Sequence, residues 1–330
     1  MILHINNIAN VGGNICQKQR ELGINSRILS FRDSITNEYN DLQYYIDQEY
    51  NRLPRRLSDA IKLSKKFNHI RKMRKDIELI HFHYGSLVHN YNLLPDGLDM
   101  LYWNKTPTPV VVHYHGSDIR WKNNEKSLTN KLADKILVSS PDLLDHAPSE
   151  AEWLPRSLDI AKIEPIYPSS SIKGEIKIVH APTRRNYKGT QKIIDSVKML
   201  RSENYPISLH IIENTAHEEA IQEYSKADII IDCVNRDFGI YGMFGIEGMA
   251  LGKPVLSSIN NLPHAVRKNC PVIDVNEDNI TKKIVKLIEN PDMIRANGVK
   301  CRQFAENNHN VDDTVNQLNE IYSNVLKNIT

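Results

Sequence analysis

The chain has 330 residues, of which 40% are hydrophobic and 25% are charged, and its formal net charge is +2. At roughly 150 residues per domain, this length predicts two globular domains. The near-neutral charge excludes a protein that attracts nucleic acid through an overall positive field.

The first residues, MILHINNIAN, lack the basic and apolar regions of a signal peptide. No stretch reaches the roughly 18 apolar residues that span a bilayer. We therefore expect a cytoplasmic protein whose membrane contact, if any, is peripheral and at the inner face. The cysteines form no CxxC pair, so we expect reduced thiols and neither a zinc site nor a disulfide framework: Cys16, Cys233, Cys270 and Cys301.

Short apolar segments alternate with longer amphipathic or charged segments along the chain. Several are continuous runs of Val, Ile and Leu, as in parallel strands that are covered on both faces. Helical segments between them predict repeated βαβ units. The predicted strands are residues 2–5, 26–31, 79–82, 110–113, 136–139, 176–180, 208–212, 229–232 and 255–258.

A segment rich in Pro and Ser, residues 160–173, interrupts this alternation, and the strand–loop–helix pattern restarts directly after it. The sequence therefore predicts an α/β fold with two Rossmann-like domains, residues 1–168 and 169–330. The last segment, 311–328, places its apolar residues on one helical face.

A glycine pair, Gly12 and Gly13, follows the first predicted strand, and ligands bind such sheets at the carboxyl ends of strands. Glycines let backbone amides approach an anion at the start of a helix, so the pair is a candidate donor-binding element. The pair does not form GxGxxG, and a tight turn is the structural alternative.

A second group of polar residues follows the buried strand 110–113. His115 at a strand end can donate or accept a hydrogen bond near neutral pH. Ser117 and Asp118 are expected to shape the loop or contact the acceptor. His113 lies inside the strand, and we interpret it as structural.

A basic loop follows the predicted strand 176–180. Arg184, Arg185 and Lys188 precede a helix that begins near Gly189. Fixed cations and backbone dipoles at this point can neutralise a diphosphate leaving group. Arg184 and Arg185 compete for the same role, and a solvated basic loop is the structural alternative.

A glycine-rich loop leads into a helix with one carboxylate, Glu247. The amides around Gly242, Met243 and Phe244 can meet phosphate oxygens. A carboxylate among apolar neighbours needs partners, and a ribose diol offers two hydroxyl donors. The structural alternative is an ion pair between Glu247 and a core Arg or Lys.

Together these stretches resemble the large retaining glycosyltransferase family that includes sucrose and bacterial cell-surface glycan synthases, often called family 4. Residues 115–118, HGSD, resemble its HGxD loop, and residues 188–189 resemble its KG segment. Residues 154–159, LPRSLD, resemble LPNGVD with Arg-Ser in place of Asn-Gly. Residues 247–255, EGMALGKPV, resemble EAMAxGKPV, which is the most specific of the four motifs.

The resemblance implies the GT-B fold, with an acceptor domain first, a donor domain second, and a last helix that packs on the first domain. It implies retaining transfer from a UDP- or GDP-linked sugar to a glycan, a lipid-linked or another hydroxyl acceptor, in cell-surface polysaccharide or glycoconjugate synthesis. No cofactor or metal is expected. His115 would contact the donor sugar, Arg184 or Arg185 with Lys188 the diphosphate, and Glu247 the ribose.

The sequence departs from this family at Gly239. Many members carry two acids spaced E-x7-E, and Glu247 matches only the second. Asp237 is out of register, whereas residues 240–242, IYG, resemble a subgroup without the first acid. Two alternatives therefore stay open, namely a non-catalytic GT-B partner subunit and a nucleotide-sugar 2-epimerase, although no acid and histidine set for the epimerase is evident.

A basic stretch spans residues 52–75, where apolar residues recur at roughly helical spacing. It predicts an amphipathic helix that binds an anionic membrane surface or presents an ordinary solvated face. Aromatic residues are sparse and no recognition motif is present, so nucleic acid is not an expected partner. The basic residues are Arg52, Arg55, Arg56, Lys62, Lys65, Lys66, Arg71, Lys72, Arg74 and Lys75.

Overall fold

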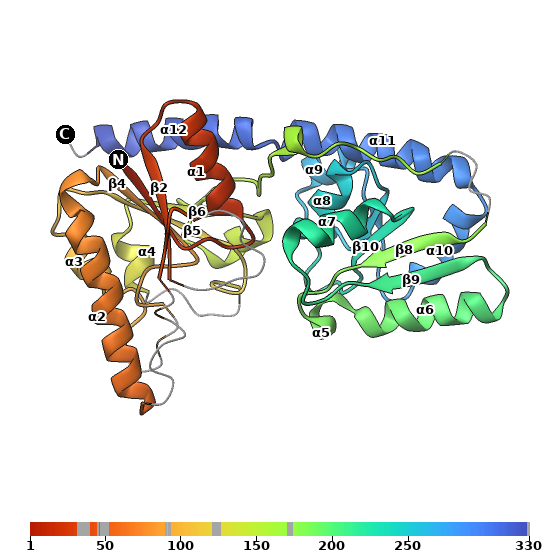
Figure 1. Cartoon of the computed structure of the whole chain (residues 1–330), viewed down its shortest axis with the longest axis horizontal. Coiled ribbons are helices and arrows are strands. Elements are labelled where there is room, and N and C mark those ends of the chain that lie inside the picture. Colours follow the sequence, from red (N-terminus) through yellow and green to blue (C-terminus); the bar gives the residue numbers. More distant parts are fainter. Residues whose placement is uncertain are drawn as a thin grey trace. The chain divides into compact units, whose positions relative to one another are not determined.

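The computed structural model divides into two compact units. The first comprises residues 1–157 and 311–330, and the second comprises residues 158–310. Figure 1 shows the course of the chain through both units. The structure describes residues 1–31, 40–44, 46, 53–89, 91, 94–120, 127–169 and 174–328.

A parallel sheet forms the centre of the first unit, with strand order β3-β2-β1-β4-β5-β6-β7 in its described residues. Its strands are β1 (Ile2–Ile5), β2 (Ser26–Ser30), β3 (Leu42–Gln43), β4 (Leu79–His83), β5 (Val110–Tyr114), β6 (Lys135–Val138) and β7 (Glu152–Trp153). Its helices are α1 (Val11–Glu21), α2 (Arg55–Met73), α3 (Met100–Trp103), α4 (Leu128–Leu132) and α12 (Val311–Lys327), with 3-10 turns η1 (Arg74–Asp76) and η2 (Pro141–His146).

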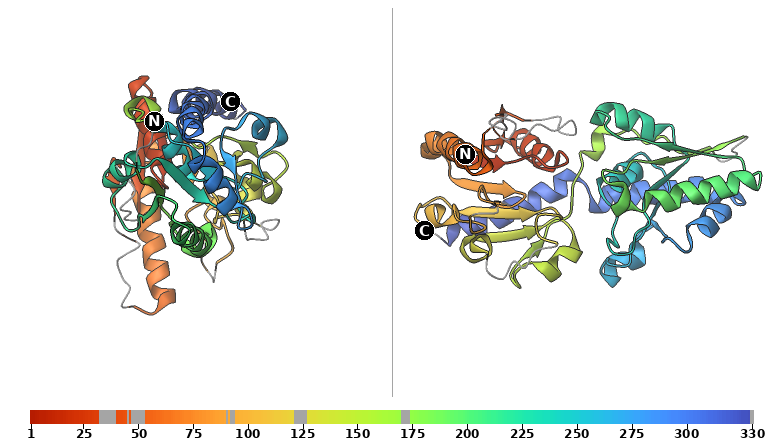
Figure 2. Two further views of the ribbon diagram at one scale, coloured as in Figure 1. Left: turned by 90° about the vertical axis from the view of Figure 1, so that its right-hand side faces the viewer. Right: turned by 90° about the horizontal axis from the view of Figure 1, so that it is seen from below.

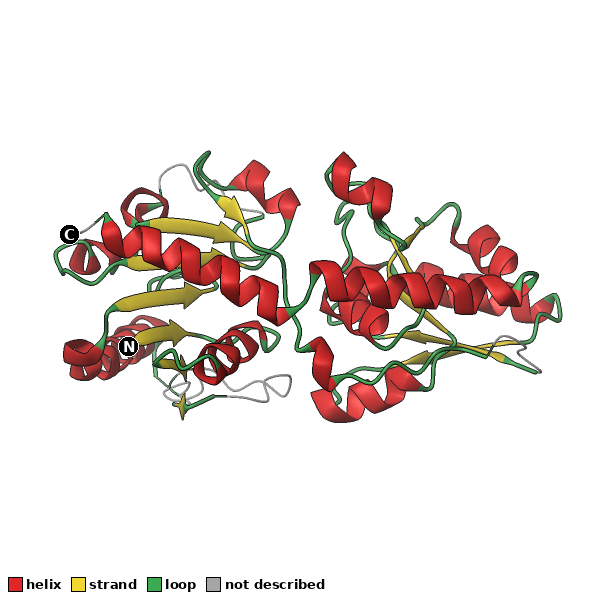
Figure 3. Cartoon of the chain, turned by 90° about the horizontal axis from the view of Figure 1, so that it is seen from above, coloured by secondary structure: helices red, strands yellow, loops and turns green. Residues whose placement is uncertain are grey.

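The two faces of this sheet differ in chemistry because side chains alternate along each strand. One face carries Leu3, Ile5 and Phe82, which pack in one apolar core with residues of α2 and α3. The opposite face carries histidines, among them His4 and His81, whose rings reach α1 and α12. These two helices contact each other and lie over the sheet (Figure 3).

The second unit contains a parallel sheet with strand order β12-β11-β10-β8-β9 in the described residues. Its strands are β8 (Ile176–His180), β9 (Ile207–Ile211), β10 (Ile229–Cys233), β11 (Val255–Ser257) and β12 (Ile273–Asp274). Its helices are α5 (Arg185–Lys188), α6 (Thr190–Ser202), α7 (His217–Ser225), α8 (Met243–Ala250), α9 (His264–Asn269), α10 (Ile280–Ile288) and α11 (Pro291–Asn308), with a 3-10 turn η3 (Ile160–Lys162).

Separate apolar clusters cover the two faces of this second sheet. Ile230 and Val255 pack with residues of α7, α8 and α11, whereas Ile178 and Ile231 pack with residues of α6 and α10. Helices therefore lie on both sides of the strands (Figures 1 and 2). This is why β10 begins in the sequence with a continuous apolar run, residues 229–231.

The predicted α/β fold with two parallel sheets is confirmed, but the predicted boundary after residue 168 is wrong. Leu158 and Ile160 are buried in the core of the second unit, and Leu158 forms an isolated parallel β-bridge with Asn310. The chain leaves the first unit at Ser157 and returns to it at Val311, so that α12 packs on α1.

The cysteines are free thiols, and burial raises the pKa of each well above its ordinary value, to about 12 for Cys16 and Cys301 and about 11 for Cys233 and Cys270. At neutral pH they are protonated and therefore weak nucleophiles and metal ligands. In the described part of the chain, no helix combines the length and the apolar character needed to cross a membrane.

Candidate functional site

The loop after β5 is shaped by the carboxylate of Asp118. This side chain is fully buried and accepts hydrogen bonds from the backbone N–H groups of His115, at 2.8 Å, and Gly116, at 2.6 Å. Gly116 has a φ of 145°, which favours glycine. Ser117 pairs with the hydroxyl of Tyr84 at 2.8 Å. Asp118 therefore shapes the loop that presents His115, the first of the two roles expected for it.

The glycine pair at the start of α1 has local structural reasons. A side chain at Gly12 would meet Ile28 at 3.0 Å and His83 at 3.2 Å, so the strand and the helix approach closely there. The amide of Gly13 donates to the side-chain oxygen of Asn7 at 3.0 Å. These contacts support the tight turn, the alternative to the predicted donor-binding role.

Lys188 lies at the centre of a polar cluster in the second unit. Its ammonium is 2.6 Å from Oδ1 of Asp232, which is fully buried in β10. Oδ2 of the same carboxylate accepts a hydrogen bond from the backbone N–H of Gly242, where α8 begins. Asp232 thus holds a cation and the N-terminal end of a helix together at the carboxyl end of the sheet.

The two arginines of the basic loop differ in their surroundings. Arg185 forms a bidentate pair with Glu213, at 2.9 and 2.6 Å, and this hydrogen bonding lowers the pKa of the Glu213 carboxyl. The guanidinium of Arg184 lies over the ring of Tyr187, 5.4 Å from its centre. Both carboxylate oxygens of Glu213 already accept hydrogen bonds from the Arg185 guanidinium. Arg184 is therefore the better candidate for an anionic ligand.

Glu247 has a histidine partner, neither the arginine nor the lysine of the structural alternative. Its Oε1 lies 2.7 Å from Nε2 of His217 at the start of α7, and the carboxylate is buried. Phe244 packs its ring against Tyr224 in the core, at 4.7 Å between ring centres, and Met243 packs against the same core. The side chain of Phe244 is therefore part of the core, whereas that of Met243 is half-buried.

The backbone at the position of the missing acid favours glycine. Gly239 has a φ of 54°, and a Cβ there would lie 2.5 Å from the side chain of Asn261. Asn261 also bonds the backbone of this loop, since its amide donates to the carbonyl of Gly239 at 2.8 Å. An acid at this position would strain the backbone and displace the Asn261 side chain.

The basic stretch forms α2 from Arg55 onward, whereas Arg52 lies outside the described residues. Lys62 and Lys66 point inward and are only 9% and 7% exposed. Both line a cavity of about 270 Å³ beside the carboxyl ends of β1 and β4, together with Asn6 and Tyr84. The helix therefore has a buried basic side in addition to the expected solvated one.

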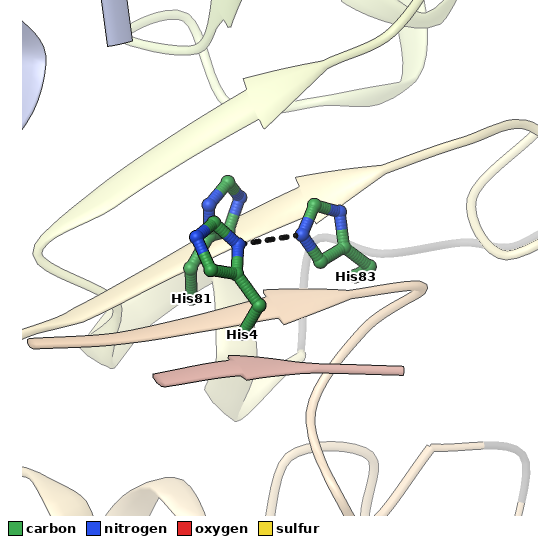
Figure 4. Close-up of side chains that lie close together, drawn as sticks. All are labelled: His4, His81 and His83. Atoms are coloured by element: carbon green, nitrogen blue, oxygen red, sulfur yellow. Dashed lines mark hydrogen bonds between the residues drawn. The ribbon is translucent and has the colours of Figure 1, made fainter. Parts of the chain in front are cut away.

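Five histidines that the sequence did not single out as a group lie together in the first unit. Their ring nitrogens come within 4.8 Å of one another in two sets of three, which is close enough to consider a metal ion. Hydrogen bonds at 3.1 Å already join His4 to His83 and His83 to His115 (Figure 4 shows the first). We therefore assign His4, His83 and His115 to hydrogen bonding.

The fold is shared along nearly the whole chain with solved structures. Sucrose-phosphate synthase from Thermosynechococcus elongatus has a TM-score of 0.66 and 14% identity over 99% of both chains. HepE from Anabaena, in complex with UDP and glucose, has a TM-score of 0.62 and 14% identity over 98% of this chain and 99% of that chain. An α-glucosyltransferase in complex with UDP and a DNA 13-mer has a TM-score of 0.64 and 10% identity over the same shares.

These similarities show that the chain has the GT-B fold of two Rossmann-like domains. No family model and no curated protein matches the sequence. At such identities the fold alone is shared, and one fold hosts many different activities.

Proposed function

We propose that the chain is a retaining, family 4-like glycosyltransferase that moves a sugar from a UDP- or GDP-linked donor to a hydroxyl acceptor. The observation that carries this proposal is the cluster of Lys188, Asp232 and the Gly242 amide at the start of α8. A cation beside the N-terminal end of a helix is suited to a diphosphate. The UDP in the HepE and α-glucosyltransferase complexes supports the same class of donor.

Each residue takes a defined part in the proposed reaction. As the bond between the anomeric carbon and the diphosphate breaks, Lys188 and Arg184 stabilise the negative charge that grows on the leaving oxygen. Glu247, oriented by His217, accepts hydrogen bonds from the ribose hydroxyls. His115 contacts the donor sugar. The acceptor oxygen attacks the face that the diphosphate leaves, and the departing phosphate takes the acceptor proton, so neither a metal nor a cofactor is required.

We assign the acceptor to the first unit, at the cavity beside β1 and β4. Arg55, Lys62 and Lys66 line this cavity together with the carboxylate of Asp59, and this excess of cations suits a glycan or lipid-linked acceptor with an anionic group. The exposed basic residues further along α2 support peripheral contact with the inner membrane face, in synthesis of a cell-surface polysaccharide or glycoconjugate.

Binding and turnover of nucleotide sugars test this proposal. Calorimetric titration should show binding of UDP or GDP, and a panel of nucleotide sugars should reveal a donor that is hydrolysed slowly without acceptor. Activity should persist in excess EDTA. Failure to bind either nucleotide indicates the partner subunit, whereas an epimerised donor indicates the 2-epimerase. Activity that EDTA abolishes and Mg²⁺ or Mn²⁺ restores contradicts the metal-independent mechanism.

A further inference from the structure

A row of histidines lines one face of the first sheet, where β1, β4 and β5 lie side by side. The register places His4 beside His81 and His83 beside His113. All four side chains are fully buried. His115 follows on the same side of β5, where the row reaches the candidate site.

Three hydrogen bonds connect part of this row to α1. The side-chain oxygen of Gln19 lies 2.8 Å from Nε2 of His4. Nδ1 of His4 lies 3.1 Å from Nε2 of His83 (Figure 4). Nδ1 of His83 lies 3.1 Å from Nε2 of His115. We call Gln19, His4, His83 and His115 the histidine chain.

The rings of the histidine chain are neutral at physiological pH. Burial lowers the pKa of His4 to about 4 and holds the pKa of His83 and of His115 well below the ordinary value. A neutral imidazole donates with one nitrogen and accepts with the other. The direction of one bond in the histidine chain therefore fixes the direction of the others.

The amide oxygen of Gln19 faces His4 and can only accept a hydrogen bond. Nε2 of His4 must then donate, and its Nδ1 accepts from Nε2 of His83. Nδ1 of His83 in turn accepts from Nε2 of His115. This leaves Nδ1 of His115 as a hydrogen-bond acceptor. Rotation of the Gln19 amide would reverse all three bonds and make Nδ1 a donor.

We propose that Gln19, His4 and His83 are positioning residues that hold His115 as the Nε2-protonated tautomer, so that its Nδ1 accepts a hydrogen bond from a hydroxyl of the donor sugar. The contact with the sugar rests on the proposed function, whereas the tautomer does not. A site that accepts from a hydroxyl discriminates strongly against a donor that lacks it.

His113 provides a matched control for this proposal. It lies in the same row and is equally buried, and its ring lies against those of His83 and His115, at 5.7 and 4.3 Å between centres. Within the described residues, neither of its ring nitrogens has a hydrogen-bond partner. His113→Phe therefore disturbs the packing of the row without breaking the histidine chain, whereas His4→Phe breaks it.

Nitrogen NMR of the full chain labelled with ¹⁵N-histidine measures the tautomer directly. The His115 signals are identified by their loss in His115→Asn. We expect the Nε2-protonated tautomer at His115 in the wild type and in His113→Phe, and a mixture of both tautomers in His4→Phe. If His4→Phe does not fold, Gln19→Met breaks the first bond with a side chain of similar size and should give the same mixture.

The tautomer proposal is overturned if wild-type His115 is protonated on Nδ1, or if breaking the histidine chain in a folded variant leaves His115 unchanged. Zn²⁺ added to the wild type should leave the histidine signals in place, and a shift of the His4 and His83 signals together would show a metal site instead.

Kinetics test the contact with the sugar separately. His4→Phe should raise the KM for the nucleotide sugar roughly twofold, because a mixture with about half of each tautomer halves the fraction of molecules that can accept the hydrogen bond, and leave the affinity for the free nucleotide unchanged. His113→Phe should change neither. If His4→Phe alters the tautomer of His115 but leaves the KM unchanged, the contact with the sugar is overturned. If the protein turns over no nucleotide sugar, the proposed function fails while the NMR result still decides the tautomer.

Discussion

Lys188 is held by a carboxylate that is itself satisfied by a backbone amide, so its position is fixed before any ligand binds. Asp232 takes one of the three N–H donors of the ammonium and bonds Gly242 with its other oxygen. A preorganised cation stabilises developing charge without reorganisation during the reaction.

Lys188→Ala should lower donor turnover by roughly two to three orders of magnitude, the scale for removal of one preorganised charge-stabilising group. Lys192→Ala is the matched control, because Lys192 is an exposed cation one turn further along the chain in α6. Initial rates of donor hydrolysis measure both variants. A loss of less than threefold in Lys188→Ala would identify Lys188 as a surface cation without a role in the reaction.

Glu247→Gln should weaken nucleotide binding by about 1–3 kcal/mol, the range for hydrogen bonds to a charged group. The change is isosteric, so the fold should survive, and the amide can still accept a hydrogen bond from His217. Titration with UDP and GDP measures the effect, with Glu306→Gln on the exposed side of α11 as the control. Equal affinity in the wild type and Glu247→Gln would contradict the ribose assignment.

Sequence reasoning selects His115, Lys188 and Glu247 because each follows an apolar strand or a glycine-rich loop. Their partners cannot be found in this way. Asp232 lies 44 residues from Lys188, and His217 lies 30 residues from Glu247. Only the folded chain brings these pairs together, and a carboxylate at the end of an apolar strand is the one local signal that Asp232 offers.

At the scale of elements, all nine predicted strands are present in the structure, because short runs rich in Val, Ile and Leu indicate strands that are largely buried. The predicted strands omit β3, β7 and β12, which have two residues each and carry too little pattern. The histidine row cannot be predicted from the sequence for a related reason. Histidines at alternate positions of β4 look like ordinary strand residues in the sequence. Only the register of the sheet brings them beside the histidines of β1 and β5.

The buried histidines should make the first unit sensitive to acid. Burial lowers the pKa of His4 from 6.5 to about 4 and that of His113 to about 3, the latter with smaller effects from Arg156 and His4. The unfolded chain takes up protons below pH 6.5 while these folded rings stay neutral. The free energy of unfolding should therefore fall as the pH decreases from 6.5 toward 4, by about 1.4 kcal/mol per pH unit for each ring.

Urea unfolding followed by tryptophan fluorescence measures this effect, because the three tryptophans lie at positions 103, 121 and 153, within the first unit. Between pH 7 and pH 5, the free energy of unfolding should fall by about 2 kcal/mol less in His113→Phe than in the wild type. The exposed His264 is the control, and His264→Phe should keep the wild-type decrease. Equal pH dependence in wild type and His113→Phe would show that this ring is not neutral and buried in solution.

At the scale of the whole molecule, the chain crosses between its units twice, at Ser157 and after Asn310. The Pro- and Ser-rich segment predicts a boundary after residue 168, because such a composition is typical of connections between domains. Composition does not indicate which core the residues before the segment pack into. Leu158 and Ile160 belong to the second core through tertiary packing, which the local pattern does not contain. The GT-B fold is thus predictable from strand order and motifs, whereas the division of the chain is not.

Exposed basic residues lie at the end of α2 and in the adjoining turn η1. Arg71, Lys72 and Lys75 are solvent-exposed, in contrast to the buried Lys62 and Lys66. If this end contacts anionic lipid, each basic residue contributes about 1 kcal/mol, and salt screens the attraction. The wild type should therefore sediment with anionic vesicles at low ionic strength and dissociate at high salt.

Replacing Arg71, Lys72 and Lys75 with Gln should weaken vesicle binding by roughly a hundredfold, since about 3 kcal/mol of attraction is removed. Arg74 is kept because its guanidinium contacts Tyr102. The matched control replaces three lysines of α10 in the second unit with Gln and removes the same charge from a different helix: Lys282, Lys283 and Lys286. Both triple variants should keep wild-type donor hydrolysis. If the two variants bind vesicles equally well, net charge alone accounts for binding, and α2 is an ordinary solvated helix.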